Sequence, residues 1–406
     1  MRIALTPEQG DLREELRAYF NELVTPERRA ALSSATGEFG GSGSGEFGDK
    51  SVYREVIRQI GEDGWLGIGW PEEYGGQARS MVEQLIFTDV AAVAGVPIPY
   101  LTLNTIGPTI MQYGTDAQKD YFLPRILKGQ LHFSVGYSEP GSGTDLASLQ
   151  TKAVLDETAG PDGSGEWVIN GQKMWTSLIQ YADWIWLACR TEPDQPRHKG
   201  LSMLLVPADA SGVSYTPVHT VAGVDTSATY FSDVRVPAEN LVGGRGGGWR
   251  LITNQLNRER VALTSSAATV HSLDLVRDWA TTTRTPDGRR VIDQEWVQLL
   301  LGRAHARVEA LTLIQWKLAA EIDTMSPADA SATKVYGSEL NTEIYRTLME
   351  VLGPNAIVSG GAAAQLAGRI ERYARSSLVM TFGGGTNEIQ RDIIGMVGLG
   401  LPAARR

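Results

Sequence analysis

The chain has 406 residues, of which 42% are hydrophobic, enough for two or three packed units. Its formal charge of −10 argues against nucleic acid as a partner, and its apolar runs, broken by Gly and Pro, are too short to span a membrane. The single cysteine, Cys189, excludes an internal disulfide framework and predicts a reducing, cytoplasmic setting. The five histidines show no metal-ligand spacing, so we expect no metal site.

Residues 1–130 are expected to form a helical domain. Thr6 and Gln9 match a capping box around Pro7. One apolar stripe follows, made of Leu12, Leu16, Phe20 and Leu23. Helical periodicity continues from about residue 52 to 121, with a loop at 69–77.

Residues 131–245 change to a period of two, which predicts strands. Asn170-Gly171, between 167–169 and 173–175, indicates a hairpin turn. Further strands are expected at 184–190, 201–207 and 228–237. Together they predict a small β-barrel or sandwich.

Residues 246–406 return to the helical period. Ser326 and Pro327 mark the start of a long helix, and Gly353 marks its end. Its apolar stripe consists of Leu340, Ile344, Leu348 and Leu352. We therefore expect an antiparallel four-helix bundle, in an α+β multidomain fold.

Six motifs occur in one order along the chain, and they resemble those of the acyl-CoA dehydrogenases. They span residues 70–76, 114–119, 137–145, 170–175, 233–240 and 385–391. Residues 176–183 and 382–386 look most similar to subunits of actinobacterial steroid side-chain dehydrogenases, which are typically α2β2 heterotetramers of unlike chains. The resemblance implies removal of two hydrogens from an acyl-CoA, with FAD as cofactor and an electron-transfer flavoprotein as acceptor.

Such a reaction needs a base for the α-proton, an acceptor for the β-hydride, and donors for the thioester oxygen. A protein side chain cannot accept hydride, so a flavin is implied. By resemblance, the flavin ring contacts Tyr137, Ser138, Trp175 and Ser177, and the adenosine side contacts Thr386 and Glu388. From the residues alone, Trp175 also fits a core position and Ser138 a turn cap.

The base is the most informative position. Many family members carry it in the loop before Gly-Thr-Asn-Glu, where this chain has Gly384. Another branch places it on the first bundle helix, where this chain has Glu259 on the apolar stripe of Ile252, Leu256 and Leu263. Burial would raise the pKa of Glu259 toward the range of a general base. An ion pair with Arg258 or Arg260, or a surface position, is the alternative.

The remaining substrate contacts also follow from the resemblance. Arg260 is expected beside the thioester, as the second catalytic residue, although an ordinary surface arginine fits the spacing too. The other candidates are Gly384, Gly385, Ser142 and Thr144. From the residues alone, Thr144 also fits a turn cap, and the glycines fit a flexible connector. A loop without side chains suits a bulky acyl group, such as a steroid side chain.

One stretch departs from the homomeric family pattern. Where those members bind a neighbour's flavin tail through Gln and Gly-Gly, this chain has Glu350 and Gly353-Pro354. A carboxylate repels pyrophosphate, and proline has no N–H to donate. We therefore expect a second, unlike subunit. An acyl-CoA oxidase and a non-catalytic subunit are the alternative functions.

Overall fold

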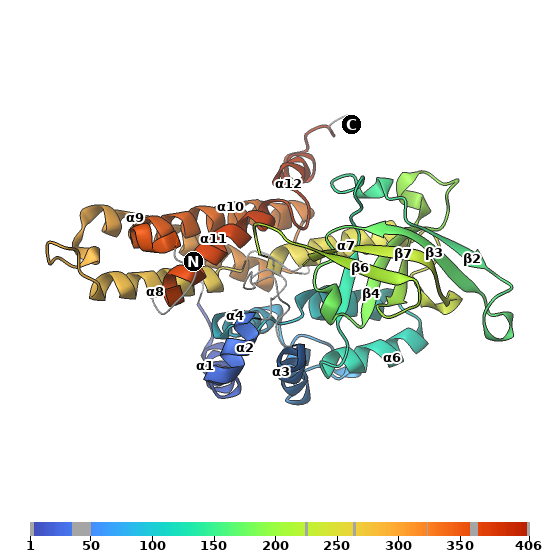
Figure 1. The fold of residues 1–406 in the computed structure, drawn as a ribbon, viewed down its shortest axis with the longest axis horizontal. Helices are drawn as coiled ribbons and strands as arrows, with labels where there is room; N and C mark the ends of the chain where they lie inside the picture. The colour runs from blue at the N-terminus through green and yellow to red at the C-terminus, as the bar shows by residue number, and fades with distance from the viewer. Residues whose placement is uncertain are drawn as a thin grey trace.

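The computed structural model describes residues 4–34, 50–223, 226–262, 265–322, 324–357 and 364–403. The side chains of residues 33, 34, 50, 162, 256–262, 364 and 365 lie outside this description. Helices precede and follow the β region along the chain, so the predicted order of α, β and α units is confirmed (Figure 1).

The described part of the N-terminal region, below the bundle and the sheet in Figure 1, contains the α-helices α1 (Pro7–Leu23), α2 (Pro26–Ser34), α3 (Lys50–Glu62), α4 (Met81–Ala94), α5 (Gly107–Tyr113) and α6 (Asp116–Leu127). The predicted capping box is present, since Thr6 and Gln9 bond reciprocally at the start of α1. A π-helical turn, η3 (Thr102–Ile106), runs directly into α5. Such turns often mark functional sites.

Among the described residues, the β region is one hydrogen-bonded sheet of eight strands: β1 (Phe133–Gly136), β2 (Lys152–Asp156), β3 (Glu166–Lys173), β4 (Trp184–Arg190), β5 (Leu201–Pro207), β6 (Val213–Val218), β7 (Thr226–Pro237) and β8 (Leu241–Val242). Its two halves, β6-β7-β3-β2 and β4-β5-β8 with β1 beside β4, meet through the pair Lys152–Arg190. Both halves bury side chains in one core, among them Trp167, Leu187 and Val234. This shared core fits the expected small barrel or sandwich.

The predicted hairpin at Asn170-Gly171 is wrong. Both residues lie inside the continuous strand β3, at an irregularity in its pairing with β7. The Asn170 side chain bonds Asp233 on β7 instead of closing a turn, at 2.9 and 3.0 Å. Gly171 allows a close approach, because a Cβ there would lie 2.7 Å from the Cα of Thr151. The Asn-Gly pair therefore serves a bulge rather than a turn.

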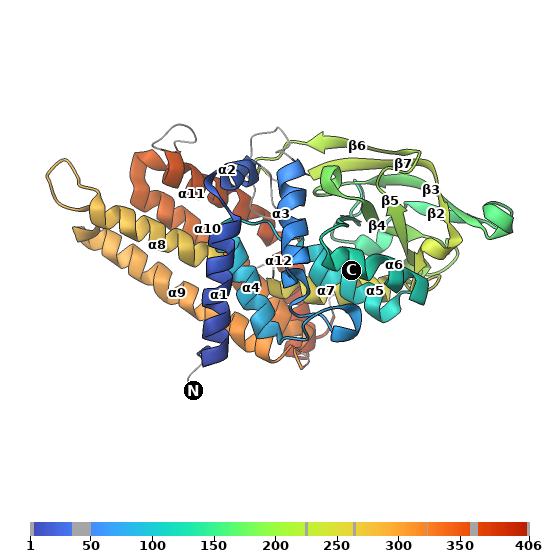
Figure 2. The ribbon, with the colours of Figure 1, turned by 90° about the horizontal axis from the view of Figure 1, so that it is seen from below.

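The C-terminal region contains α7 (Gly248–Ala262), α8 (Ala267–Thr282), α9 (Glu295–Ala320), α10 (Pro327–Leu352), α11 (Ala364–Ser376) and α12 (Asn387–Ile393). Helices α8 to α11 run side by side, as Figures 1 and 2 agree, and share a core that includes Val308, Leu340 and Leu348. The predicted Ser326 cap is confirmed, and Gly353 follows α10 with a left-handed φ of 62°.

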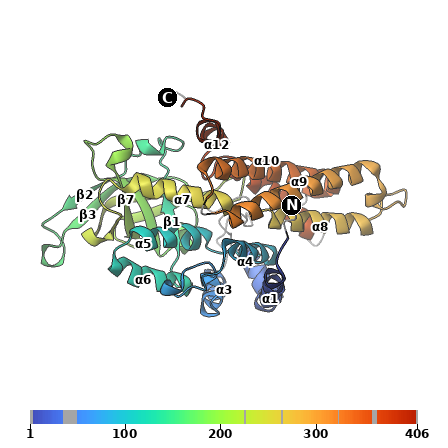
Figure 3. The ribbon, with the colours of Figure 1, turned by 180° about the vertical axis from the view of Figure 1, so that it is seen from behind.

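Helix α7 occupies the junction of all three regions. It runs from the sheet toward the bundle in Figures 1 and 3. Its buried Leu251 and Ile252 belong to the same core as Leu103 of the N-terminal region and Trp186 and Met203 of the sheet. A group on this face of α7 can therefore reach the place where the regions meet.

Candidate active site

Tyr137, directly after β1, connects the sheet to α7. Its hydroxyl donates to Oε1 of Gln255 on α7 and accepts from Nε1 of Trp186 at 3.1 Å. Gln255 Nε2 donates in turn to Oγ1 of Thr105, in the π-helical turn, at 3.4 Å. Because Gln255 is only 1% exposed, this run of polar groups lies within the core and fixes α7 against the end of β1.

The segment after β3 lies beside the end of β1. The N–H of Met174 donates to the Ser138 carbonyl at 2.8 Å, and the Ser134 hydroxyl donates to the carbonyl of residue 177 at 2.7 Å. Trp175 has a left-handed φ of 64° and is 54% exposed. Non-glycine residues hold such a conformation only where their surroundings enforce it. The structure thus gathers four of the predicted cofactor contacts at one place, which we call the platform: Tyr137, Ser138, Trp175 and Ser177.

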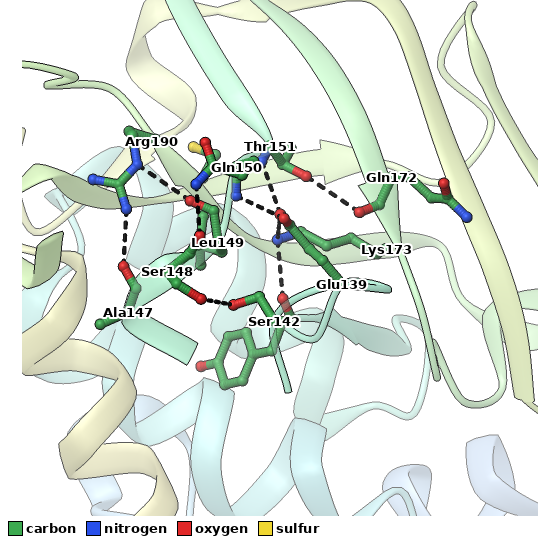
Figure 4. A network of polar contacts seen from close by, with 12 residues as sticks. Glu139, Ser142, Ala147, Ser148, Leu149, Gln150, Thr151, Gln172, Lys173 and Arg190 are labelled. Carbon is green, nitrogen blue, oxygen red and sulfur yellow. Dashed lines mark hydrogen bonds and ion pairs between the residues drawn. The ribbon is translucent and has the colours of Figure 1, made fainter. Parts of the chain in front are cut away.

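A buried ion pair lies behind the platform (Figure 4). The Lys173 ammonium, at the end of β3, is 0% exposed and lies 2.9 Å from Oε1 of Glu139 and 3.0 Å from the Tyr137 carbonyl. The Glu139 carboxylate also accepts the N–H groups of Gln150 at 2.6 Å and Thr151 at 2.8 Å. The pair therefore connects the segments after β1, before β2 and at the end of β3.

Burial and ion pairing shift the pKa values of Lys173 and Glu139 in opposite directions. Burial lowers the pKa of Lys173, and the Glu139 carboxylate opposes that shift. For Glu139, burial works to raise the pKa, but the Lys173 charge and the bonds from Thr151 and Gln150 together lower it. Each charge is thus compensated by the other inside the protein.

The two predicted substrate residues of the neighbouring loop differ in exposure. Ser142 is buried, and its hydroxyl lies 2.8 Å from both the Asp145 carbonyl and the Ser148 hydroxyl. Thr144 is exposed, and Asp145 forms an ion pair with Arg197. Ser142 therefore shapes the loop from inside, while Thr144 is free to meet a ligand from solvent.

The glycine loop lies on the bundle side, before α12. Gly384 and Gly385 have left-handed φ values of 66° and 97°, and a Cβ on Gly385 would lie 2.6 Å from Nε2 of Gln390. The buried Lys334 of α10 donates to the Gly385 carbonyl at 2.8 Å and to Oδ1 of Asn387 at 2.7 Å. A lysine therefore supports this loop from below, as Lys173 supports the platform.

Thr386 and Glu388, the predicted adenosine-side residues, begin α12. The Thr386 hydroxyl accepts the N–H of Ile389 at 3.3 Å as the N-cap. Glu388 is exposed in the first turn, where its own main-chain N–H and the Thr386 hydroxyl lower its pKa. Thr386 and Glu388 thus form a polar helix start, and a cofactor role for these two residues stays a prediction.

The side chains of the two predicted catalytic residues, Glu259 and Arg260, lie outside the described residues, as does Leu256. Their main chain belongs to α7. In an α-helix, position 259 comes one turn after Gln255 and two turns after Ile252, both of which are buried. The main chain of α7 therefore carries buried residues one and two turns before position 259.

Family models cover nearly the whole chain. Residues 6–130, 134–234 and 246–399 match the N-terminal, middle and C-terminal domains of acyl-CoA dehydrogenase, respectively. The chain belongs to the acyl-CoA dehydrogenase family. It is accordingly a flavin-dependent oxidoreductase, as the resemblance implied.

Individual acyl-CoA dehydrogenases are similar over their full length. The chain is 59% identical to acyl-CoA dehydrogenase FadE26 of Mycobacterium tuberculosis over 415 residues, covering 100% of both. Among solved structures, it is similar to the ChsE4-ChsE5 complex from Mycobacterium tuberculosis, with a TM-score of 0.89 and 60% identity over 100% of each chain. The Tcur3481-Tcur3483 steroid ACAD has a TM-score of 0.87 and 45% identity, with 100% of each chain covered.

The residues of the platform fit an acyl-CoA dehydrogenase flavin. A flat heteroaromatic ring needs an accessible aromatic face and nearby polar groups. Trp175 presents its indole more than half exposed, whereas Trp167 and Trp186 of the same sheet are almost fully buried. Within the described ranges, no group of His, Cys, Asp and Glu is placed to hold a metal ion. None of the described helices has the length and apolar character that crossing a membrane requires.

The residues that support the site were not predicted from the sequence. Lys173 and Glu139 both stood inside quoted motifs, and Gln255 and Lys334 were not singled out. One signal was present for Lys173. It alternates along β3 with Trp167 and Ile169, so it is expected on the same buried face, where a lysine is unusual.

Proposed function

We propose that this chain carries out FAD-dependent α,β-dehydrogenation of an acyl-CoA thioester, with Glu259 as the base. The observation that carries the proposal is the Tyr137–Gln255 bond, which fixes α7 beside the platform one helical turn before position 259. Bound FAD would supply the acceptor for the β-hydride. Tyr137, Ser138, Trp175 and Ser177 would hold its ring, and Thr386 and Glu388 its adenosine side.

In this proposal the chain's own groups handle the proton and the thioester. Glu259 would take the α-proton, and burial on the inner face of α7 would raise its pKa toward that task. Arg260 would position the thioester. The glycine loop at 383–385 would let main-chain N–H groups approach the thioester oxygen, since Gly384 has no side chain there to act as base.

We further propose a bulky, steroid side-chain acyl group as the substrate. The support is the absence of side chains at Gly384 and Gly385, together with the similarity to a structure described as a steroid ACAD. Ser142 would shape the loop that carries Thr144, and Thr144 would meet the CoA portion. Side chains at these two glycine positions would leave less room for a fused ring system.

We also infer a partner subunit of unlike sequence, in an α2β2 assembly, and an electron-transfer flavoprotein as acceptor. Similar solved structures include the two-component complexes ChsE4-ChsE5 and Tcur3481-Tcur3483. Glu350 is exposed near the end of α10, followed by the turn at Gly353 and Pro354. That end of α10 would suit a neighbour's pyrophosphate poorly. We retain a three-domain division at 1–130, 131–245 and 246–406, and a cytoplasmic setting, as proposals.

The test is turnover by a Glu259→Gln variant, purified with any subunit that accompanies it. Removing a general base should lower kcat by about a hundredfold or more, while bound FAD per chain stays unchanged. Glu295→Gln, at the exposed start of α9, is the matched control and should leave kcat unchanged. Normal turnover in the Glu259 variant would remove the base assignment, and hydrogen peroxide release would indicate an oxidase instead.

A further inference from the structure

The buried pair Lys173–Glu139 has no part in the proton transfer, although it lies directly behind the platform. Both side chains come from segments that also carry platform residues: Glu139 follows Ser138, and Lys173 precedes Trp175 by two positions. Figure 4 shows the pair at the centre of a polar network that joins three strand ends. Stability alone does not explain a buried ion pair, because well-packed hydrophobic side chains often stabilise a core equally well.

Two successive residues of β3 and its extension bind two successive carbonyls after β1. The Lys173 ammonium contacts the Tyr137 carbonyl at 3.0 Å, and the Met174 N–H contacts the Ser138 carbonyl at 2.8 Å. This arrangement sets the orientation of the main chain at both platform residues. Glu139 then anchors Lys173 from the opposite side, through the N–H groups of Gln150 and Thr151.

The segment beyond Lys173 is held in a conformation that its sequence does not favour. Trp175 and Leu178 are both left-handed, with φ values of 64° and 58°. Non-glycine residues in this region persist when surrounding contacts over-determine them. At the near end of the segment, the contacts that do so are the Lys173 pair and the Met174 bond. At the far end, the N–H of Thr176 donates to the Ser227 carbonyl at 3.0 Å.

The loop on the far side of Glu139 is fixed by the same network. Glu139 and Ser142 exchange main-chain hydrogen bonds of 2.9 and 3.0 Å, which close a tight turn. Arg190 of β4 donates to the carbonyls of Ala147 at 2.9 Å and Leu149 at 3.2 Å, as Figure 4 also shows. The position of the Glu139 carboxylate is therefore fixed by its surroundings, so it can hold the Lys173 ammonium in one place.

We propose that the Lys173–Glu139 ion pair is a positioning element for the flavin ring. It fixes the carbonyls of Tyr137 and Ser138 and the start of the strained Trp175 segment, and so sets both the affinity for FAD and the polarity around the ring. This inference rests on the proposed function, because it assumes that the platform receives the flavin. Both side chains are buried, so both act through the platform.

The test compares FAD binding by variants of the full chain, purified with any accompanying subunit. The decisive variant is Lys173→Met/Glu139→Gln, which removes both charges and leaves no unpaired ion in the core. We expect its apparent Kd for FAD to rise at least tenfold, with a shifted visible spectrum of the remaining bound flavin. Its midpoint of unfolding without FAD should stay close to that of the unaltered chain.

Two further variants separate positioning from general loosening. Arg235→Met removes an exposed ion pair between β7 and Asp156 and Glu166 of the same sheet, and should leave the Kd and the spectrum unchanged. Lys173→Arg keeps the charge and should restore much of the affinity lost in the double variant.

Tight FAD binding with an unshifted spectrum in the double variant would overturn the inference. So would a loss of affinity that merely follows a lowered unfolding midpoint, because that result would assign the pair a structural role alone. If the unaltered complex binds no FAD at all, the proposed function fails, and this outcome is recognised before any variant is compared.

Discussion

Two buried lysines support two groups of predicted ligand contacts, the platform and the glycine loop, and they do so differently. Lys173, behind the platform, is paired with a carboxylate that is itself fixed by two main-chain N–H groups. Lys334, beneath the glycine loop, donates to a carbonyl and an amide oxygen at 2.8 and 2.7 Å. Both are 0% exposed, so each charge has been taken fully out of water.

The difference shows how each region can respond to change. A charge pair is strongly coupled, because the loss of one member leaves the other uncompensated in a medium of low polarity. The two hydrogen bonds from Lys334 to neutral oxygens leave two unpaired acceptors when the lysine is removed, and that loss by itself costs less than a stranded buried charge. We therefore expect the platform to be the rigid side of the site and the glycine loop the more tolerant side.

The largest effect on stability should follow Lys173→Met. The substitution leaves the Glu139 carboxylate buried without its cation, and the free energy of unfolding should fall by about 3–5 kcal/mol. Denaturant titration of the purified protein measures this directly. Recovery of most of that loss on adding Glu139→Gln would show that the stranded charge causes it, and no recovery would contradict this reading.

A pH-dependent effect should appear at Asp89, where α4 meets the bundle helix α8. Burial raises its pKa to about 7 from an ordinary 3.8, against the hydrogen bond from Ser265 at 2.7 Å. The native state then keeps the proton to a higher pH than the unfolded state does. This group therefore costs native stability progressively as the pH rises from about 4 to 7, and its cost is constant above that window.

The measurement is the unfolding free energy of Asp89→Asn relative to the unaltered chain across that range. The amide cannot ionise, so the variant should gain in relative stability between pH 4 and 7, by up to about 4 kcal/mol. A difference that does not change with pH would mean that the carboxyl titrates normally.

Lys334→Met should have the smallest of the three effects. The Gly385 carbonyl and Asn387 Oδ1 would each lose a donor, and the free energy of unfolding should fall by about 1–3 kcal/mol. Side-by-side melts with Lys173→Met test the ranking. A larger loss at Lys334 than at Lys173 would reverse the proposed contrast between a rigid platform and a tolerant loop.

Local signals gave the correct helix starts and several strands. The caps at Thr6 and Ser326 act within three residues, so they can be identified from sequence. The strands 184–190 and 201–207 lie where their apolar runs predicted. The hairpin at Asn170 failed because its side chain pairs with Asp233, a partner 63 residues away that no local pattern reveals.

The same limit applies to the site. Motifs and resemblance predicted the cofactor contacts, and the structure gathers Tyr137, Ser138, Trp175 and Ser177 as a platform. The supporting pair Lys173–Glu139 spans 34 residues and forms only when the segment after β1 meets the end of β3. Its burial depends on packing between strands, which a single sequence does not specify. The Tyr137–Gln255 bond, across 118 residues, was hidden for the same reason.

The most direct test of the central claim is a single anaerobic turnover. The purified complex with bound FAD is mixed with a steroid side-chain acyl-CoA, and flavin absorbance is followed by stopped flow. With the native residue at position 259, we predict rapid bleaching, and with Glu259→Gln a rate lower by about a hundredfold or more at equal FAD occupancy. Bleaching of the Glu259→Gln complex at the native rate would contradict the account.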